Sequence, residues 1–185
     1  MNDVLRTIAR RRSVRQFGPG QIKDADLHAI LEAGLQAPSG HNDQSWYFAV
    51  VQDEKLIKEL SDGSKLSMQK SPIPWMAKLG QNEKIHIYHN APAVIIVAAK
   101  KDAITPVPDI SAAIENMMLA ATSLGLGSCW IGFTKFYFDS PEKDKRIGIP
   151  EGYEVAYGVA LGNLPAGYQP TPPERKYERY YHIIK

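Results

Sequence analysis

Apolar residues recur at the spacing of an amphipathic helix in three segments of the chain. The pattern predicts a first helix behind a capping Asn2 or Asp3, a second from about Asp24, and a third over residues 109–124. The third segment is apolar around most of its circumference, and Gly125 behind it is a natural left-handed stop. Because such a helix must be buried, we expect a second subunit to cover part of it.

Uninterrupted apolar runs predict four strands, at residues 46–51, 93–99, 128–133 and 155–161. Residues 54–60 predict a short helix, residues 61–74 a loop rich in Ser, Gly, Lys and Pro, and residues 75–79 a helical turn. The alternation of helices and strands is typical of α/β and α+β domains. At 185 residues we expect one domain, residues 1–185, with a substantial core.

Composition narrows the class of protein without indicating a ligand. A hydrophobic share of 44% and a charged share of 23% are ordinary for a soluble globular protein, and a net charge of +2 is too small to indicate nucleic acid. A single cysteine excludes an intrachain disulfide and is typical of a reducing compartment, so we expect a cytoplasmic protein. We expect no membrane partner, because the apolar run 91–99 is too short to cross a bilayer and no signal peptide is visible.

The densest polar chemistry follows the first predicted helix. Residues 11–17 read Arg-Arg-Ser-Val-Arg-Gln-Phe, which places three guanidiniums and a hydroxyl within five residues. Guanidiniums bind phosphate oxygens in bidentate fashion, and a hydroxyl adds a further donor. The alternative is a solvated helix C-terminus whose positive charge offsets the helix dipole, and we assign that role to Arg6 and Arg10.

A second polar segment, residues 37–46, reads Ala-Pro-Ser-Gly-His-Asn-Asp-Gln-Ser-Trp and runs directly into a predicted strand. An ordinary helix-to-strand turn accounts for its Pro-Ser-Gly part, but not for two amides so close together. Ser39, Asn42 and Gln44 can meet both the donors and the acceptors of a flat heteroaromatic ring. The two segments together predict a nucleotide-like cofactor.

These two motifs resemble those of the nitroreductase family of FMN-dependent NAD(P)H oxidoreductases. The resemblance continues through Tyr-His-Asn-Ala-Pro at 88–92, Asn-Met-Met-Leu-Ala-Ala at 116–121, Leu-Gly-Leu-Gly-Ser-Cys-Trp-Ile-Gly-Phe at 124–133 and Pro-Glu-Arg at 173–175. Each piece recurs by chance, but the set in the family's order is highly specific. The resemblance implies an α+β fold with a mixed, mainly antiparallel central sheet flanked by helices, and a homodimer with exchanged tails.

The resemblance also implies roles for individual residues. Arg11 and Ser13 hold the FMN phosphate, Arg175 returns to it, and Arg15 approaches the N1/O2 edge of the ring, where its charge stabilises reduced flavin. Backbone amides around positions 131 and 132 lie near flavin N5 and O4. The expected cofactor-binding residues are Arg11, Arg12, Ser13, Arg15, Pro38, Ser39, Gly40, Asn42, Gln44, Ile131, Gly132 and Arg175.

The implied activity is electron transfer from NAD(P)H through FMN to a small organic acceptor such as a nitroaromatic or a quinone, in ping-pong order. Because the flavin carries the chemistry, we expect no catalytic side chain. Two alternatives stay open: a flavin carrier or redox sensor without efficient turnover, and a reductive dehalogenase or flavin-fragmenting enzyme on the same scaffold.

Two further patterns resemble ligand-binding motifs but do not predict such sites. His86 and His89 have the spacing of a metal pair on a helix but lack further ligands nearby, so we expect structural histidines and no metal. The Gly125-x-Gly127 pair lacks the third glycine and the strand-to-helix order of a dinucleotide fingerprint. Met68, Trp75 and Met76 fall where the family often places a substrate-side lid, although a hydrophobic patch under a loop explains them equally well.

Overall fold

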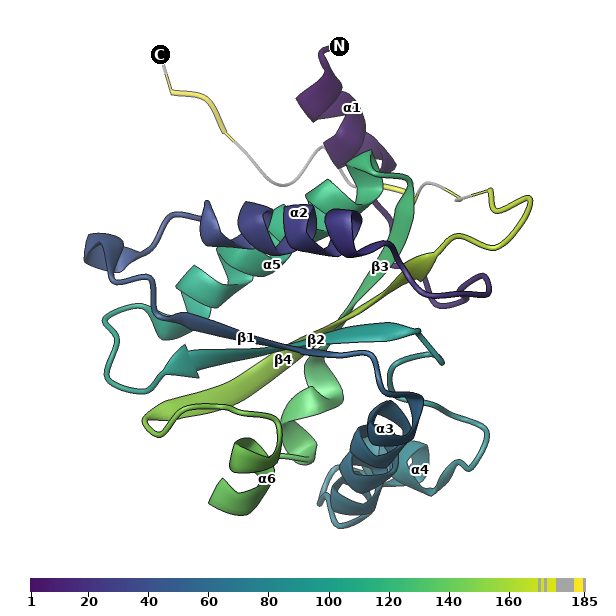
Figure 1. The fold of residues 1–185 in the computed structure, drawn as a ribbon, viewed down its shortest axis with the longest axis vertical. Helices are drawn as coiled ribbons and strands as arrows, with labels where there is room; N and C mark the ends of the chain where they lie inside the picture. Colours follow the sequence, from purple (N-terminus) through teal and green to yellow (C-terminus); the bar gives the residue numbers. More distant parts are fainter. Residues whose placement is uncertain (170, 172, 176–181, 185) are drawn as a thin grey trace.

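The computed structural model describes residues 1–169, 171, 173–175 and 182–184. Four strands form one antiparallel sheet in the order β1-β2-β4-β3 (Figure 1). The strands are β1 (Trp46–Val51), β2 (Ala93–Lys100), β3 (Leu126–Ile131) and β4 (Tyr153–Asn163). Among the described residues, the one parallel pairing is a bridge between Ser13 and Ser128. The expected α+β fold with a mixed, mainly antiparallel sheet is therefore confirmed.

The central strand β2 shows how the sheet separates two cores. Every residue from 93 to 99 is buried, and successive side chains point to opposite faces. Ile95 and Val97 pack into one core, and Val94 and Ile96 into the other. Helices cover both faces of the sheet (Figure 1). The helices are α2 (Asp24–Leu35) and α5 (Pro106–Ser123) on one face, and α3 (Glu54–Gln69), α4 (Pro74–Gln81) and α6 (Pro141–Arg146) on the other.

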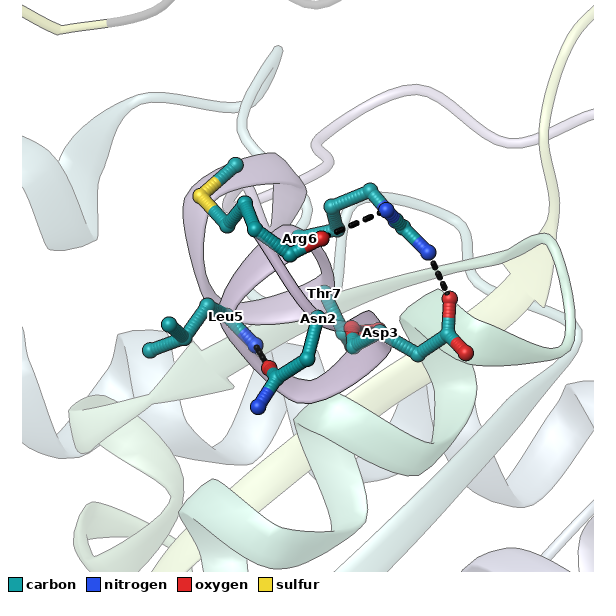
Figure 2. A network of polar contacts seen from close by, with 6 residues as sticks. Asn2, Asp3, Leu5, Arg6 and Thr7 are labelled. Carbon is teal, nitrogen blue, oxygen red and sulfur yellow. Dashed lines mark hydrogen bonds and ion pairs between the residues drawn. The ribbon is translucent and has the colours of Figure 1, made fainter.

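The first helix, α1 (Asp3–Arg10), begins at a side-chain cap. The Oδ1 atom of Asn2 accepts a hydrogen bond from the Leu5 N–H at 3.0 Å, which confirms the expected cap (Figure 2). Arg6 pairs with Asp3 in the first turn, as the same figure shows. The expected role of Arg6 at the helix C-terminus is therefore wrong, because its nearest opposite charge lies one turn before it. Arg10 is the last residue of the helix, as expected.

Helix α1 leaves its apolar face uncovered, whereas most large apolar side chains of α5 are buried. No residue of α1 is buried, and Val4, Leu5 and Ile8 expose 65%, 52% and 50% of their surface. On α5, by contrast, Ile114 and Met117 are fully buried between the sheet and α2. The expectation that a second subunit must cover this helix is therefore wrong for Ile110, Ile114, Met117 and Met118, which α2 and the sheet enclose, whereas Leu119 stays half-buried and Leu124 is 41% exposed.

Helix α3 extends well beyond its predicted end. The expected loop is wrong for residues 61–69, which continue the helix. Ser61 and Ser64 are buried, and a Cβ at Gly63 would lie 2.5 Å from the Tyr137 ring. Small residues therefore permit close packing here instead of marking a loop. Helix α6 carries no apolar periodicity and was not predicted. None of the helices in the described part of the chain is long and apolar enough to span a membrane.

Candidate functional site

A pocket of about 480 Å³ lies at the end of β3. The residues that line it are Arg15, residues 129–133, Leu79, residues 84–87, His89 and Asn90. Strand β3 ends at Ile131, and a short 3-10 helix (Gly132–Phe136) turns the chain away from the pocket. The structure therefore brings together three residues predicted from distant parts of the sequence, Arg15, Ile131 and Gly132.

The arginine segment is attached to the outer edge of β3. The Val14 N–H donates to the Ser128 carbonyl at 2.8 Å, and Ser13 pairs with the same residue. A Cβ at Gly127 would lie 2.8 Å from Val14 Cγ1, so the close approach of the segment to β3 requires glycine there. The Gly125-x-Gly127 pair therefore has two roles. Gly127 permits this contact, and Gly125, with φ +77°, ends α5.

The guanidiniums of the segment point to different surroundings. Arg11 forms an ion pair with Glu115 of α5, with 3.2 Å between Nε and Oε1. Arg12 donates to the carbonyl groups of Ala9 and Arg11 and lines a separate cavity of about 390 Å³. Arg15 lines the pocket at the end of β3. The structure therefore places Arg15 at the pocket and turns Arg12 away from it.

Arg15 acts on two titratable neighbours in this pocket. Burial lowers the pKa of His89, and the positive charge of Arg15 lowers it further. Burial raises the pKa of the Cys129 thiol, against the opposing effect of Arg15 and Arg11. Cys129 is 2% exposed and stays a protonated, packed thiol near neutral pH.

The segment opposite Arg15 is a turn held by one imidazole. The Nδ1 atom of His86 accepts hydrogen bonds from the N–H groups of Tyr88 and Asn90, at 3.2 and 3.3 Å. His89 and Asn90 have φ of 55° and 54°, in the left-handed region that non-glycine residues seldom adopt. Burial lowers the pKa of His86, which keeps the imidazole neutral and able to accept. His86 thus holds the turn through the two hydrogen bonds that it accepts, and the described residues form no metal-binding cluster. That His86 and His89 are structural and bind no metal stays a prediction.

The loop between α2 and β1, residues 38–45, is called here the ring loop. Three of its residues, His41, Asn42 and Gln44, have φ of 52°, 59° and 47°. Such conformations cost roughly 1–3 kcal/mol each and persist only where surrounding contacts hold them. The Ser39 hydroxyl accepts from the Gln44 N–H at 3.0 Å, which closes the loop internally. The ring loop is therefore a constrained segment and not an ordinary turn.

A buried carboxylate anchors the ring loop to the first turn of α5. Asp109 accepts hydrogen bonds from the Gly40 N–H at 3.0 Å, the Ser45 hydroxyl at 2.9 Å and the Thr105 hydroxyl at 2.8 Å. The Gly40 amide is thus turned toward α5. A Cβ at Gly40 would lie 2.2 Å from Thr105 Oγ1, so the position requires glycine.

Within one chain, the ring loop leads into one edge strand of the sheet, β1, and the pocket lies at the end of the other, β3. Figure 1 shows these two strands in the sheet. Three strand spacings between these edges amount to about 14 Å. The two also differ in position along the strands. Trp46, which follows the ring loop, is level with Glu154 of β4 through its partner Ala99, whereas Ile131 at the pocket is level with Gly158 of β4. A single flat ring therefore cannot touch both within one copy.

Other expected residues fall outside these two groups. Arg175 is exposed, and none of its described contacts places it beside Arg11. The expected exchange of tails involves the C-terminal residues 177–184, most of which lie outside the described residues, and Ile183 and Ile184 are exposed. In the expected lid region Met68 is fully buried, whereas Trp75 is 57% exposed with its ring 6.3 Å from that of Phe133.

Several pocket residues were not predicted from the sequence. The turn at residues 84–90 overlaps the Tyr-His-Asn-Ala-Pro motif at 88–92, but the motif did not predict that this turn lines the pocket. Phe133, which follows the expected amides, lines the same pocket. A larger cavity of about 920 Å³ lies beyond the wall formed by His86 and Asn90. Its lining carries lysine and acidic side chains together, so its charge indicates no particular ligand.

Comparison with known proteins covers nearly the whole chain. The model of the Nitroreductase family matches residues 8–163. A protein of Archaeoglobus fulgidus, provisionally named NADH dehydrogenase/NAD(P)H nitroreductase, is 35% identical over 167 residues, 88% of this chain and 86% of that protein. An iodotyrosine deiodinase of Thermotoga neapolitana is 28% identical over 183 residues, 95% of this chain and 93% of that protein.

Solved structures agree with the sequence comparison. The crystal structure of a nitroreductase with bound FMN from Bacteroides fragilis superimposes with a TM-score of 0.91 and 37% identity, covering 100% of both chains. The fold, the arginine segment, the ring loop and the β3 pocket thus occur in a chain that matches the family over most of its length. The protein belongs to the nitroreductase family.

Proposed function

We propose that the protein is an FMN-dependent oxidoreductase that takes electrons from NAD(P)H and passes them to an organic acceptor such as a nitroaromatic or a quinone. The observation that carries the proposal is the pocket in which Arg15 lies with the Ile131–Gly132 backbone. Membership of the nitroreductase family and the similar Bacteroides fragilis enzyme with bound FMN support the cofactor. The expectation of an FMN-dependent enzyme is confirmed at this level.

The residues present fit FMN. A pocket of about 480 Å³ is within the range of roughly 300–1,000 Å³ that small-molecule sites occupy. Its Phe133 side chain provides apolar surface for a flat ring, and Arg15 provides one positive charge. Arg11 and Ser13 lie four and two residues away along the chain and offer bidentate and hydroxyl donors to a phosphate.

In this proposal FMN, when bound, supplies two-electron transfer between NAD(P)H and the acceptor. Arg11 and Ser13 hold the phosphate. Arg15 favours the negative charge that reduction places on the ring and so raises the reduction potential. The backbone at Ile131 and Gly132 offers fixed donors that need no reorganisation. No side chain of the chain has to act as a general acid or base.

We infer that two copies of the chain form each site. The ring loop of one copy completes the β3 pocket of the other, because the two cannot meet around one ring within a single chain. The apolar face of α1, with Val4, Leu5 and Ile8 exposed, gives a second copy a surface to cover. Burying such a face contributes about 25 cal/mol per Å². The active form is then a homodimer with two sites.

The absorption spectrum of the purified protein tests this function. Flavin bands, and a released cofactor that elutes with FMN and not with FAD, are expected. Anaerobic titration with NADH and then NADPH should bleach the bands, and addition of a nitroaromatic or a quinone should restore them. Bleaching without reoxidation by either acceptor would indicate a carrier or sensor. FAD as the only flavin would contradict the proposal.

The deiodinase of Thermotoga neapolitana supports a second candidate, reductive dehalogenation. Its similarity spans 95% of this chain at 28% identity, so the same scaffold could present a halogenated phenol to the flavin. Iodide release from iodotyrosine, compared with nitroaromatic reduction as kcat/KM in the same preparation, separates the two candidates.

We propose that the protein works in the cytoplasm as a single domain, residues 1–185, on small molecules and not on nucleic acid or membranes. Its one cysteine is buried, its net charge is +2, and both cores pack on the same sheet.

A further inference from the structure

Asp109 is the one buried carboxylate among the described residues, with 3% of its surface exposed. No lysine or arginine of the described part of the chain lies within ion-pair distance of it. Burying a charge without a cation is costly unless hydrogen bonds compensate for the lost water.

Three donors from two separate segments supply the compensation. They are the N–H of Gly40 and the hydroxyl of Ser45, both in the ring loop, and the hydroxyl of Thr105 just before α5. The carboxylate also lies in the first turn of α5, where the helix dipole favours negative charge. Burial raises the pKa of Asp109, but the three hydrogen bonds outweigh burial and hold that pKa below its usual value. The carboxylate is therefore charged at neutral pH.

The two loop contacts fall on either side of the strained residues. Gly40 and Ser45 are both tied to Asp109, and between them lie His41, Asn42 and Gln44, all with positive φ. Tying both ends to one rigid helix removes the chain's freedom to relax into more favourable conformations. Asp109 thus holds the shape of the ring loop without needing to touch what the loop binds.

We propose that Asp109 is a positioning residue that presents the ring-loop amides of Asn42 and Gln44 to the flavin bound in the partner copy. The inference rests on the proposed function, because it assigns the ring loop to an FMN site. It adds a residue outside both cofactor motifs and makes the start of α5 part of the binding machinery. Loss of the anchor should weaken flavin binding while the sheet and both cores stay folded.

The test compares Asp109→Asn with a control that is destabilised at the same place in the fold. Ile110→Val removes a buried methylene from the next residue of α5 and leaves every anchor contact intact. FMN dissociation constants are measured by flavin fluorescence well below the melting temperature of each variant. We expect Asp109→Asn to raise the dissociation constant about tenfold or more, and Ile110→Val to leave it within about twofold of the parent chain.

Two further measurements keep the proposal falsifiable. If Asp109→Asn does not fold, Thr105→Val takes its place. It removes a single donor to Asp109 and should weaken FMN binding several-fold. Hydrogen exchange of the apo protein should accelerate in residues 39–45 of either anchor variant and not in Ile110→Val. The positioning role would be overturned if the anchor variant that folds, Asp109→Asn or Thr105→Val, bound FMN as tightly as the control Ile110→Val. Failure of the parent chain to bind FMN would overturn the proposed function itself, and with it this inference.

Discussion

Arg11 and Glu115 form an ion pair that joins the end of α1 to the middle of α5, with 3.2 Å between Nε and Oε1. The pair fixes the direction of a guanidinium that the family motif assigns to the FMN phosphate. Arg11 keeps its remaining N–H groups for a second anion, because a guanidinium carries five donors. Glu115 is half-exposed, so it leaves the Arg11 guanidinium accessible to a second anion that approaches from solvent.

Arg11→Ala should therefore weaken FMN binding by about tenfold or more, because a hydrogen bond to a charged group contributes roughly 1.5–3 kcal/mol. Arg6→Ala is the matched control, since it removes an exposed arginine of α1 that pairs only with its own helix. Equilibrium titration with FMN measures both. Equal affinities in the two variants would show that the phosphate binds elsewhere.

Arg15 is expected to tune the flavin more than it binds it. Arg15→Gln should lower the reduction potential of bound FMN and slow its reduction by NAD(P)H, because the positive charge that favours reduced flavin is lost. Arg15→Lys keeps the charge and should stay closer to the parent value. An anaerobic redox titration measures the potential. An unchanged potential in Arg15→Gln with FMN bound would remove Arg15 from the N1/O2 edge.

Gly127, at the start of β3, and Gly132, which lines the pocket, should respond differently to alanine. Gly127→Ala places a Cβ 2.8 Å from Val14 Cγ1, so it should cost about 1–3 kcal/mol of folding stability even without cofactor. Gly132 has nothing within 4 Å of a Cβ, so Gly132→Ala should leave the stability of the apo protein unchanged. If the flavin lies against Gly132, the same substitution should still weaken FMN binding. Loss of apo stability in Gly132→Ala, or full FMN affinity, would argue against this placement.

The turn held by His86 predicts a pH dependence of stability. Burial lowers the pKa of His86 below the ordinary histidine value of 6.5, so the folded state binds fewer protons than the unfolded state. The stability that the neutral imidazole provides is complete above pH 6.5 and is lost as the pH falls through the folded pKa. Asp62 opposes this shift, while His89, Lys58 and Lys65 reinforce it.

Urea unfolding between about pH 7.5 and about pH 5 should show this loss in the parent chain. The dependence should shrink in His86→Gln, and His28→Gln, which changes an exposed histidine of α2, serves as the control. A slope that is the same in both variants would show that His86 does not control the turn.

The architecture could be predicted largely from apolar pattern. The four strands and α2 and α5 lie within a few residues of their predicted places, because long apolar runs and helical periodicity report burial directly. Residues 61–69 were missed because serine and glycine signal a loop in the sequence, whereas Gly63 and Ser64 serve close packing of α3.

The site could be predicted only in its parts. The motifs identified the arginine segment and the ring loop, but no spacing along the chain shows that they stand at opposite edges of the sheet. The proposed role of Asp109 could not be predicted from the sequence for a different reason. It lies 69 residues from Gly40 and 64 from Ser45, and its partners are a backbone amide and hydroxyls that carry no motif. Arg12 shows the reverse case, since it belongs to the motif yet faces a different cavity.

The central claim, one flavin site built from two copies, can be tested directly with mixed dimers. One copy carries Arg11→Ala, and the other, with a different affinity tag, carries Asn42→Ala and Gln44→Ala. Each variant alone has two damaged sites and should bind FMN weakly. The dimer purified through both tags should regain one site with the affinity of the parent chain, because an intact pocket on the second copy meets an intact ring loop on the first. One tight FMN per mixed dimer is the predicted result, and a mixed dimer with only weak sites would contradict the account.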